Sequence, residues 1–145
     1  GLIKNKYVGR TFIQPTQALR EKGVKMKLSP VKSIVKGKRI VLVDDSIVRG
    51  TTSLKIVSML REAGATEVHV RIGSAPLKYT CFYGVDIHTP EELISSSHSV
   101  DEVCKIIGAD SLAFLSHEGM LRAGRRDDLC LACFNAKYPT KLYEE

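Results

Sequence analysis

The sequence has 145 residues, of which 43% are hydrophobic and 26% charged, a composition typical of one globular domain with its own core. No apolar run approaches the roughly 20 residues of a membrane-spanning helix, and no charged-then-apolar leader opens the chain, so we expect neither a membrane span nor a signal peptide. The net charge of +6 favours anionic ligands.

The positive charge is concentrated in residues 1–40, which contain eleven Lys and Arg and a single acid, Glu21. Such a segment suits a polyanionic partner or a small phosphorylated substrate, and it is equally compatible with a solvated, flexible arm. Nucleic acid is disfavoured, because the sequence has no Trp, no aromatic-rich RNA-binding strand and no zinc-finger spacing of Cys and His.

Residues 4–33 alternate poorly and are interrupted by Gly and Pro, so we expect a loop there, with a short basic helix near residues 16–22. Residues 40–43 are a continuous apolar run that predicts a buried strand. Residues 52–63 predict an amphipathic helix that stops at Gly64, and residues 68–72 predict the next strand. The apolar positions of this helix are Leu54, Ile56, Val57, Leu60 and Ala63.

These elements predict a strand–helix–strand unit with a right-handed crossover and parallel strands. Further along, we expect a helix over residues 99–107 that ends at Gly108, a strand over residues 111–115, and a short helix over residues 118–123. The predicted fold class is therefore α/β with a parallel sheet.

The segment VLVDDSIVRGTTS, residues 41–53, joins the first strand of that unit to its helix. Ligands of parallel α/β sheets bind beyond the carboxyl ends of the strands, where this segment must lie. Its helical end, at Gly50, Thr51 and Thr52, offers free N–H groups and a positive helix dipole to a phosphate. Its strand end carries Asp44 and Asp45. A purely structural alternative is that the acids cap the turn and Thr51 caps the helix.

Two other phosphate motifs are absent, because the sequence has no Gly-Lys-Ser/Thr loop and no G-x-G-x-x-G after the strand. VLVDDSIVRGTTS instead resembles the phosphoribosyl pyrophosphate signature of type I phosphoribosyltransferases. KNKYVGRTFIQP (residues 4–15), CFYGVD (81–86) and SHSVDEVCKIIGADSLAFLS (97–116) are similar to the C-terminal part of the glutamine phosphoribosylpyrophosphate amidotransferase family. The resemblance covers essentially the whole chain.

The resemblance implies the parallel sheet of a type I phosphoribosyltransferase, incomplete within residues 1–145, which would form the C-terminal portion of the domain. Residues 1–33 would be a flexible basic lid and linker, residues 38–123 the α/β core, and residues 124–145 a cysteine-containing tail. An N-terminal glutaminase domain would be absent from the chain. Because early strands and the pyrophosphate loop would also lie upstream, we expect little or no catalytic activity from this chain alone.

The reaction implied is the formation of 5-phosphoribosylamine from phosphoribosyl pyrophosphate and glutamine-derived ammonia, in de novo purine biosynthesis. Asp44 and Asp45 would contact the ribose hydroxyls, directly and through Mg²⁺, which prefers carboxylate oxygens. The residues implied to form or support the 5-phosphate pocket are Ser46, Arg49, Gly50, Thr51, Thr52 and Ser53. The catalytic residues implied in the lid are Lys4, Tyr7 and Arg10.

Four cysteines are present, and Cys130 and Cys133 form a C-x-x-C pair. By itself the pair is compatible with half a zinc site, a redox pair or two buried thiols. In the iron–sulfur subgroup of the family, four cysteines hold a [4Fe–4S] cluster, and Cys81, Cys130 and Cys133 match three of them. The fourth ligand would precede residue 1, and we expect Cys104 to be a buried core thiol.

The resemblance also implies a homo-oligomer, tetrameric in its full-length form, that purine nucleotides inhibit and that resides in the cytoplasm, or in the plastid of a plant. No nucleic-acid or membrane partner is expected. The four His fall in no metal-binding pattern, and we expect them to be surface residues or hydrogen-bonded ones.

Two alternatives share the signature. One is a type I phosphoribosyltransferase that acts on a purine base or orotate, which the cysteine trio and KNKYVGRTFIQP disfavour. The other is a non-enzymatic, phosphoribosyl-pyrophosphate-sensing regulator, for which no helix-turn-helix segment is visible.

Overall fold

The computed structural model describes residues 1–4, 28–85, 87 and 89–141. Its centre is a three-stranded parallel sheet in the order β3-β4-β5, formed by Arg39–Asp44, Glu67–Ile72 and Ser111–Phe114. Ile40 aligns with Val68, and Val70 aligns with Leu112. The predicted α/β class with a parallel sheet is confirmed.

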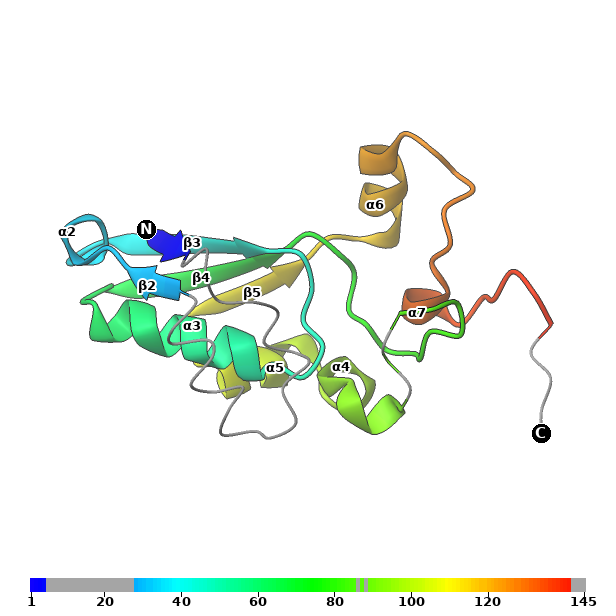
Figure 1. The fold of residues 1–145 in the computed structure, drawn as a ribbon, viewed down its shortest axis with the longest axis horizontal. Coiled ribbons are helices and arrows are strands. Elements are labelled where there is room, and N and C mark those ends of the chain that lie inside the picture. The colour runs from blue at the N-terminus through cyan, green and yellow to red at the C-terminus, as the bar shows by residue number, and fades with distance from the viewer. Residues whose placement is uncertain (5–27, 86, 88, 142–145) are drawn as a thin grey trace.

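Two helices cover one face of this sheet (Figure 1): α3 (Thr51–Glu62), which connects β3 to β4, and α5 (Val100–Ile107), which precedes β5. Val57 and Leu60 of α3 and Val68 and Val70 of β4 are each at most 1% exposed, so this contact is the main core. Leu54 is 40% exposed, so its predicted place on the buried face of the helix is wrong.

Local signals explain where the helices begin and end. Ser99 and Glu102 form a capping box at the start of α5, and Gly108 ends that helix with a φ of 73°. α6 (His117–Gly124) begins at Ser116, whose hydroxyl accepts the Gly119 N–H at 3.0 Å. The predicted helices over residues 52–63, 99–107 and 118–123 therefore agree with the structure to within one residue at each end.

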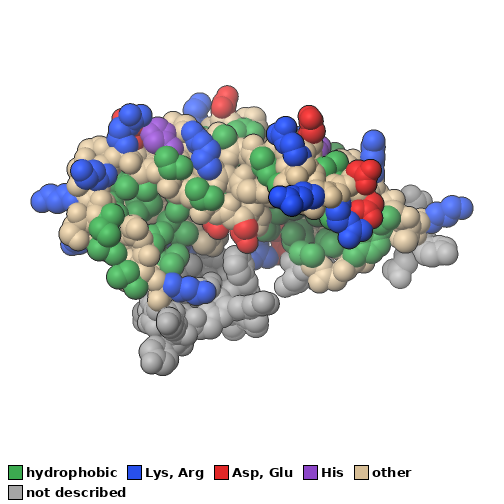
Figure 2. All heavy atoms as spheres, turned by 90° about the horizontal axis from the view of Figure 1, so that it is seen from above, with side chains coloured by type: hydrophobic (Ala, Val, Ile, Leu, Met, Phe, Trp, Pro, Cys, Tyr) green, Lys and Arg blue, Asp and Glu red, His purple; other side chains and the backbone are tan. Residues whose placement is uncertain are grey.

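The opposite face of the sheet is open along β3. Val41 and Val43 point to this face and are 62% and 73% exposed, so the prediction of a fully buried strand is wrong for half of its residues. Successive residues of a strand alternate between faces, and α3 and α5 cover only one face. Figure 2 looks onto this side of the molecule, where hydrophobic side chains are interspersed with Lys and Arg.

On β4 and β5 the same face carries a polar network centred on His69. Its Nε2 lies 2.7 Å from Glu67 Oε2, and its Nδ1 lies 2.8 Å from Ser111 Oγ. Arg39 donates to the same Glu67 oxygen at 2.7 Å. His69 is thus a hydrogen-bonded histidine, as the sequence predicts.

A small two-stranded ribbon was not predicted. β1 (Leu2–Lys4) pairs antiparallel with β2 (Leu28–Pro30), and the short helix α2 (Lys32–Val35) follows. Strands of three residues are too short to display an alternating pattern, which is why the sequence indicated only a loop. The basic helix predicted near residues 16–22 lies outside the described residues.

A second, smaller core lies beyond the carboxyl end of the sheet. Leu77, Ile87 and Leu93 are buried there, and Val48, Cys133 and Phe134 pack against them. The remaining short elements border it: the 3₁₀ helix η2 (Pro90–Glu92), α4 (Ile94–Ser97) and α7 (Ala132–Asn135). Among the described helices, none has the length and apolar character needed to cross a bilayer.

We expect Leu60→Ala to lower the free energy of unfolding by about 2–5 kcal/mol, because it removes a buried side chain and leaves a cavity between α3 and β4. The same truncation at the exposed Leu54, Leu54→Ala, is the matched control and should cost less than about 1 kcal/mol. Urea unfolding measures both, and equal losses would contradict the assignment of the core.

Candidate functional site

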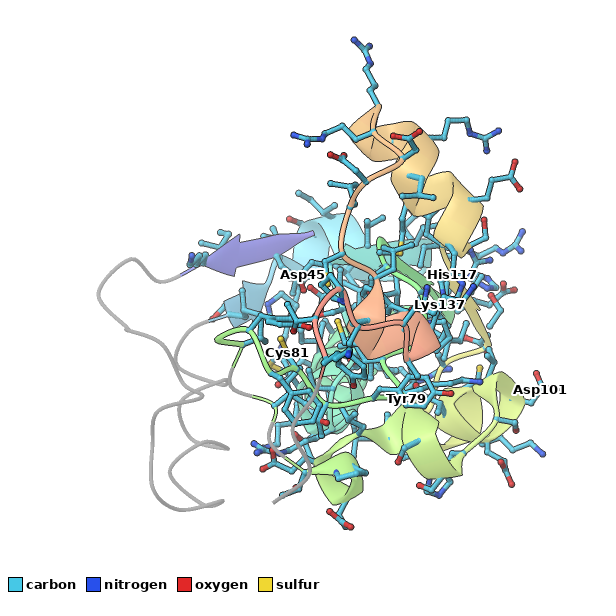
Figure 3. All side chains as sticks on the ribbon, turned by 90° about the vertical axis from the view of Figure 1, so that its right-hand side faces the viewer. Asp45, Tyr79, Cys81, Asp101, His117 and Lys137 are labelled. Carbon is cyan, nitrogen blue, oxygen red and sulfur yellow. The ribbon has the colours of Figure 1, made fainter. Side chains whose placement is uncertain are left out.

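The segment between β3 and α3, residues 45–50, lies at the carboxyl end of the sheet, as predicted. Asp44 is the last residue of β3, and its carbonyl oxygen accepts the Gly73 N–H at 2.9 Å, which ties the end of β3 to the residue after β4. Figure 3 looks toward this end of the molecule and shows Asp45 and Cys81 near its centre. We call residues 44–53 the phosphate loop.

The two adjacent acids open the phosphate loop. The Asp45 N–H donates to Asp44 Oδ1 at 3.0 Å, and Ser46 Oγ donates to Asp45 Oδ1 at 3.4 Å. Burial raises the pKa of Asp44, the Asp45 N–H counteracts this, and the neighbouring Asp45 carboxylate raises the pKa further. Asp44 is half-buried and Asp45 is exposed. Because the two carboxylates are adjacent and repel each other, a bound cation would stabilise the pair.

Gly50 sets the geometry of the other end. It is the N-cap residue of α3 with a φ of 76°, and a Cβ at this position would lie 2.9 Å from Ile94 Cδ1. The left-handed backbone therefore favours glycine, and a side chain at this position would also displace the end of the Ile94 side chain. Because the N-cap residue is glycine, it has no side chain that could cap the N-terminus of α3. The helix dipole and first-turn N–H groups can thus attract an anion.

The side chains after Gly50 differ in exposure. Thr51 is exposed and Thr52 is half-buried, whereas Ser53 is 4% exposed and points into the core. Arg49 forms an ion pair with Glu92 of η2. The predicted residues of this loop therefore lie in one segment, in which Ser53 is buried and Arg49 pairs with Glu92 outside the loop.

Of the three predicted lid residues, the structure describes only Lys4, which is not part of this assembly. Lys4 is exposed at the end of β1, where it pairs with Leu28. Tyr7 and Arg10 lie outside the described residues.

The three cysteines matched to the iron–sulfur subgroup lie in one neighbourhood. Burial raises the pKa of the Cys133 thiol, its own backbone lowers it, and the nearby Cys81 and Cys130 raise it further. The Cys133 carbonyl accepts the N–H groups of Lys78 and Tyr79, each at 3.0 Å. The Tyr83 N–H donates to Cys81 Sγ at 3.4 Å, so a backbone donor already points at this sulfur.

Aromatic side chains fasten the tail beside Cys81. Tyr138 lies with its ring centroid 5.2 Å from that of Phe82, in an edge-to-face arrangement, and 6.3 Å from that of Tyr83. Its hydroxyl donates to the Thr80 carbonyl at 2.8 Å. Residues on both sides of Cys81 therefore contact the segment that follows the C-x-x-C pair.

In the described part of the chain, no three His, Cys, Asp or Glu side chains converge closely enough to hold a metal ion by themselves. Cys81, Cys130 and Cys133 supply thiols of the kind that bind an iron–sulfur cluster, but in this structure their side chains do not converge on one point. Cys104 lies elsewhere: it is half-buried, it donates to the Ala109 carbonyl at 3.3 Å, and its charged neighbours include Asp101 and Asp110 rather than another cysteine.

Glu92 and Ile94 are the contacts of the phosphate loop that sequence reasoning missed. They stand 43 and 44 residues along the chain from their partners Arg49 and Gly50, in a segment with no strong helix or strand pattern. Only the adjacent acids of Pro90–Glu92 could have drawn attention to it, and nothing in their spacing indicates a partner in the loop.

Comparison with known proteins points to one family. Residues 2–75 match the family model of the phosphoribosyl transferase domain. The whole chain is 66% identical to the amidophosphoribosyltransferase of Bacillus subtilis, of which it covers 32%. It is 57% identical, over 99% of its length, to amidophosphoribosyltransferase 1, chloroplastic, of Arabidopsis thaliana, of which it covers 26%. The chain thus spans about a third or less of these relatives.

A solved structure agrees with this result. The glutamine phosphoribosylpyrophosphate amidotransferase of B. subtilis, complexed with ADP and GMP, superposes with a TM-score of 0.84 at 66% identity. The match covers all of this chain and 33% of that chain. The resemblance found in the sequence is confirmed.

We expect Asp44→Asn to raise the free energy of unfolding at pH 7. Ionised Asp44 is less stable in the folded protein than in the unfolded chain, because burial and Asp45 raise its pKa. That cost is present above the raised folded-state pKa and absent below the ordinary value of 3.8. The gain should therefore shrink as the pH falls from 7 to about 3, in urea titrations of both proteins.

An asparagine oxygen can still accept the Asp45 N–H, so the substitution preserves the local hydrogen bond. A loss of stability at pH 7, or a gain that is unchanged at pH 3, would contradict the proposed electrostatic cost.

Proposed function

The chain belongs to the phosphoribosyltransferase family, and we propose that it is the C-terminal, phosphoribosyltransferase portion of a glutamine phosphoribosylpyrophosphate amidotransferase. The carrying observation is the 66% identity to the B. subtilis enzyme along the whole chain. The full-length protein would form 5-phosphoribosylamine from phosphoribosyl pyrophosphate and glutamine-derived ammonia, in purine biosynthesis. A base-specific phosphoribosyltransferase and a sensor protein are not favoured by this identity.

The phosphate loop would bind the two ends of the ribose. Asp44 and Asp45 would accept hydrogen bonds from the ribose hydroxyls, since both carboxylates lie at the strand end of the loop. The 5-phosphate would lie at the uncapped N-terminus of α3. Its pocket would comprise Ser46, Arg49, Gly50, Thr51 and Thr52, with Ser53 supporting the helix from its buried side.

Mg²⁺ suits the acid pair, because hard carboxylate oxygens are its preferred protein ligands and the two charges crowd each other. When bound, it would offset the negative charge of the departing diphosphate. Asp44 and Asp45 would hold it beside the ribose. In the proposed reaction ammonia is the nucleophile, so no side chain of the chain need act as a covalent nucleophile.

The displacement at the anomeric carbon should pass through a state with oxocarbenium character, so the protein must hold the sugar, stabilise the leaving group and exclude water. We assign water exclusion to a basic lid in residues 1–33, with Lys4, Tyr7 and Arg10 as its catalytic residues. Residues 38–123 would form the α/β core, and residues 124–145 the cysteine-containing tail.

For the tail we propose a [4Fe–4S] cluster held by Cys81, Cys130 and Cys133, with a fourth cysteine supplied from upstream of residue 1. The proposal is supported by the nearby Cys81 and Cys130, which add to the effect of burial in raising the pKa of the Cys133 thiol, and by the Tyr83 N–H donated to Cys81 Sγ. Such donors are a recognised means of tuning cluster sulfurs. The aromatic contacts of Tyr138 would keep Cys81 beside the C-x-x-C pair.

The remaining partners follow from the relatives. We propose an N-terminal glutaminase domain, a homotetramer, and inhibition by purine nucleotides, which the ADP and GMP bound to the B. subtilis enzyme support. The location would be the cytoplasm or, for a plant protein, the plastid, as in the chloroplastic relative. We propose no nucleic-acid or membrane partner.

Calorimetric titration of the full-length protein with phosphoribosyl pyrophosphate and Mg²⁺ tests the substrate. We expect Asp44→Asn/Asp45→Asn to weaken binding by about tenfold or more, because hydrogen bonds to charged groups contribute roughly 1.5–3 kcal/mol. The control Asp127→Asn/Asp128→Asn removes a second adjacent acid pair from the exposed tail and should bind normally. Equal affinity in wild type and the Asp44/Asp45 variant would defeat the assignment.

Iron and sulfide analysis of the anaerobically purified full-length protein tests the cluster. We expect about four iron and four sulfide per chain. Cys133→Ser should lose most of both, whereas Cys104→Ser, which changes a thiol elsewhere, should retain them. A metal-free protein, stoichiometric zinc, or an equal loss in the Cys104 variant would refute the cluster.

A further inference from the structure

One segment outside the phosphate loop contacts three consecutive residues of it. The Ile94 N–H donates to the Val48 carbonyl at 2.8 Å, Arg49 pairs with Glu92, and Gly50 lies so close to Ile94 that a Cβ would fall 2.9 Å from its Cδ1. We call residues 90–94 the loop support. Its contacts fix the backbone on both sides of Arg49 and the charge opposite that side chain.

The position of Glu92 is set by a short, ordered turn. The Glu92 N–H donates to the Thr89 carbonyl at 3.2 Å, and the Leu93 N–H donates to the Pro90 carbonyl at 3.0 Å. Leu93 is 1% exposed in the second core, so the next residue along the chain is anchored. The Glu92 carboxylate is therefore held at the phosphate loop from a fixed backbone.

The charges of the loop support and of the proposed ligand are in conflict. Arg49 stands immediately before Gly50, the N-cap residue of α3, where the 5-phosphate is proposed to bind. Glu92 already pairs with the guanidinium, and the side chains of Arg49 and Glu92 are 36% and 33% exposed, so solvent screens the pair only in part. A phosphate at this helix terminus would draw on the same guanidinium, so it would compete with Glu92 for Arg49.

We propose that Glu92 is an internal counter-ion that competes with the 5-phosphate of the ligand for Arg49. This inference rests on the proposed phosphoribosyl site and assigns it a regulating charge. In the empty loop, Glu92 neutralises Arg49 and keeps the guanidinium beside the loop support. When the phosphate binds, Arg49 exchanges its carboxylate partner for a phosphate oxygen, and the cost of that exchange lowers the affinity. Glu92 is thus a positioning residue that contacts no reacting atom.

Ribose 5-phosphate is the appropriate probe, because it carries the one phosphate in question and no diphosphate. Titration calorimetry of the full-length protein, without Mg²⁺, should show that Glu92→Gln binds about two- to fivefold more tightly than wild type, the range expected for a partly exposed ion pair. The control is Glu91→Gln, which removes the same charge from the exposed neighbouring residue and should bind like wild type.

Two further measurements separate competition from a general structural effect. Arg49→Gln should bind more weakly, and adding Glu92→Gln to it should change nothing, because the contested guanidinium is gone. The difference between wild type and Glu92→Gln should also shrink as the salt concentration rises. A thermal unfolding curve confirms that each variant is folded.

Several results would overturn the role of Glu92: unchanged or weaker binding by Glu92→Gln, an equal gain by Glu91→Gln, or a gain that persists without Arg49. If wild type and every folded variant fail to bind ribose 5-phosphate, the phosphoribosyl site itself is refuted and this inference with it. Binding without a difference between the variants refutes the counter-ion alone.

Discussion

The packing of β4 against α3 is the contact on which the rest of the structure depends. Val68, Val70 and Ile72 are each at most 4% exposed, and burial of a side chain of this size contributes about 1.5–3 kcal/mol. β4 is also the central strand, hydrogen-bonded to β3 on one side and β5 on the other. Its register therefore decides where both neighbours end.

The position of the phosphate loop follows from that register. Asp44 aligns with Ile72, and the next residue, Gly73, donates its N–H back to the Asp44 carbonyl. The acids can therefore leave the sheet only at this edge, and α3 must return along the covered face. The sheet therefore fixes the position of the carboxylates, and the return of α3 along the covered face places the helix N-terminus at the same end of the sheet.

The sequence predicted the features that depend on local patterns. Apolar spacing located α3 and α5, Gly108 located the end of α5, and the acid pair with Gly50 indicated the candidate site. Exposure was harder to predict: Ile40 and Val41 are both β-branched, yet they face opposite sides of a sheet that α3 and α5 cover on one side. A sequence run cannot reveal how many layers pack on a sheet.

Long-range partners were beyond the reach of the sequence for a related reason. The contact between Arg49 and Glu92 joins charged residues 43 positions apart, and neither has a pattern that selects the other. The second core behaves likewise, since it brings Val48 of the phosphate loop together with Phe134 of α7. Such contacts depend on where the intervening elements fold, which spacing alone does not encode.

The Cys133 carbonyl shows how the tail can tolerate sequence drift. It receives two main-chain donors, from Lys78 and Tyr79, so these two bonds can form with any residue other than proline at those positions. A proline at either position has no N–H to donate, so it would remove one of the two hydrogen bonds that hold the Cys133 carbonyl.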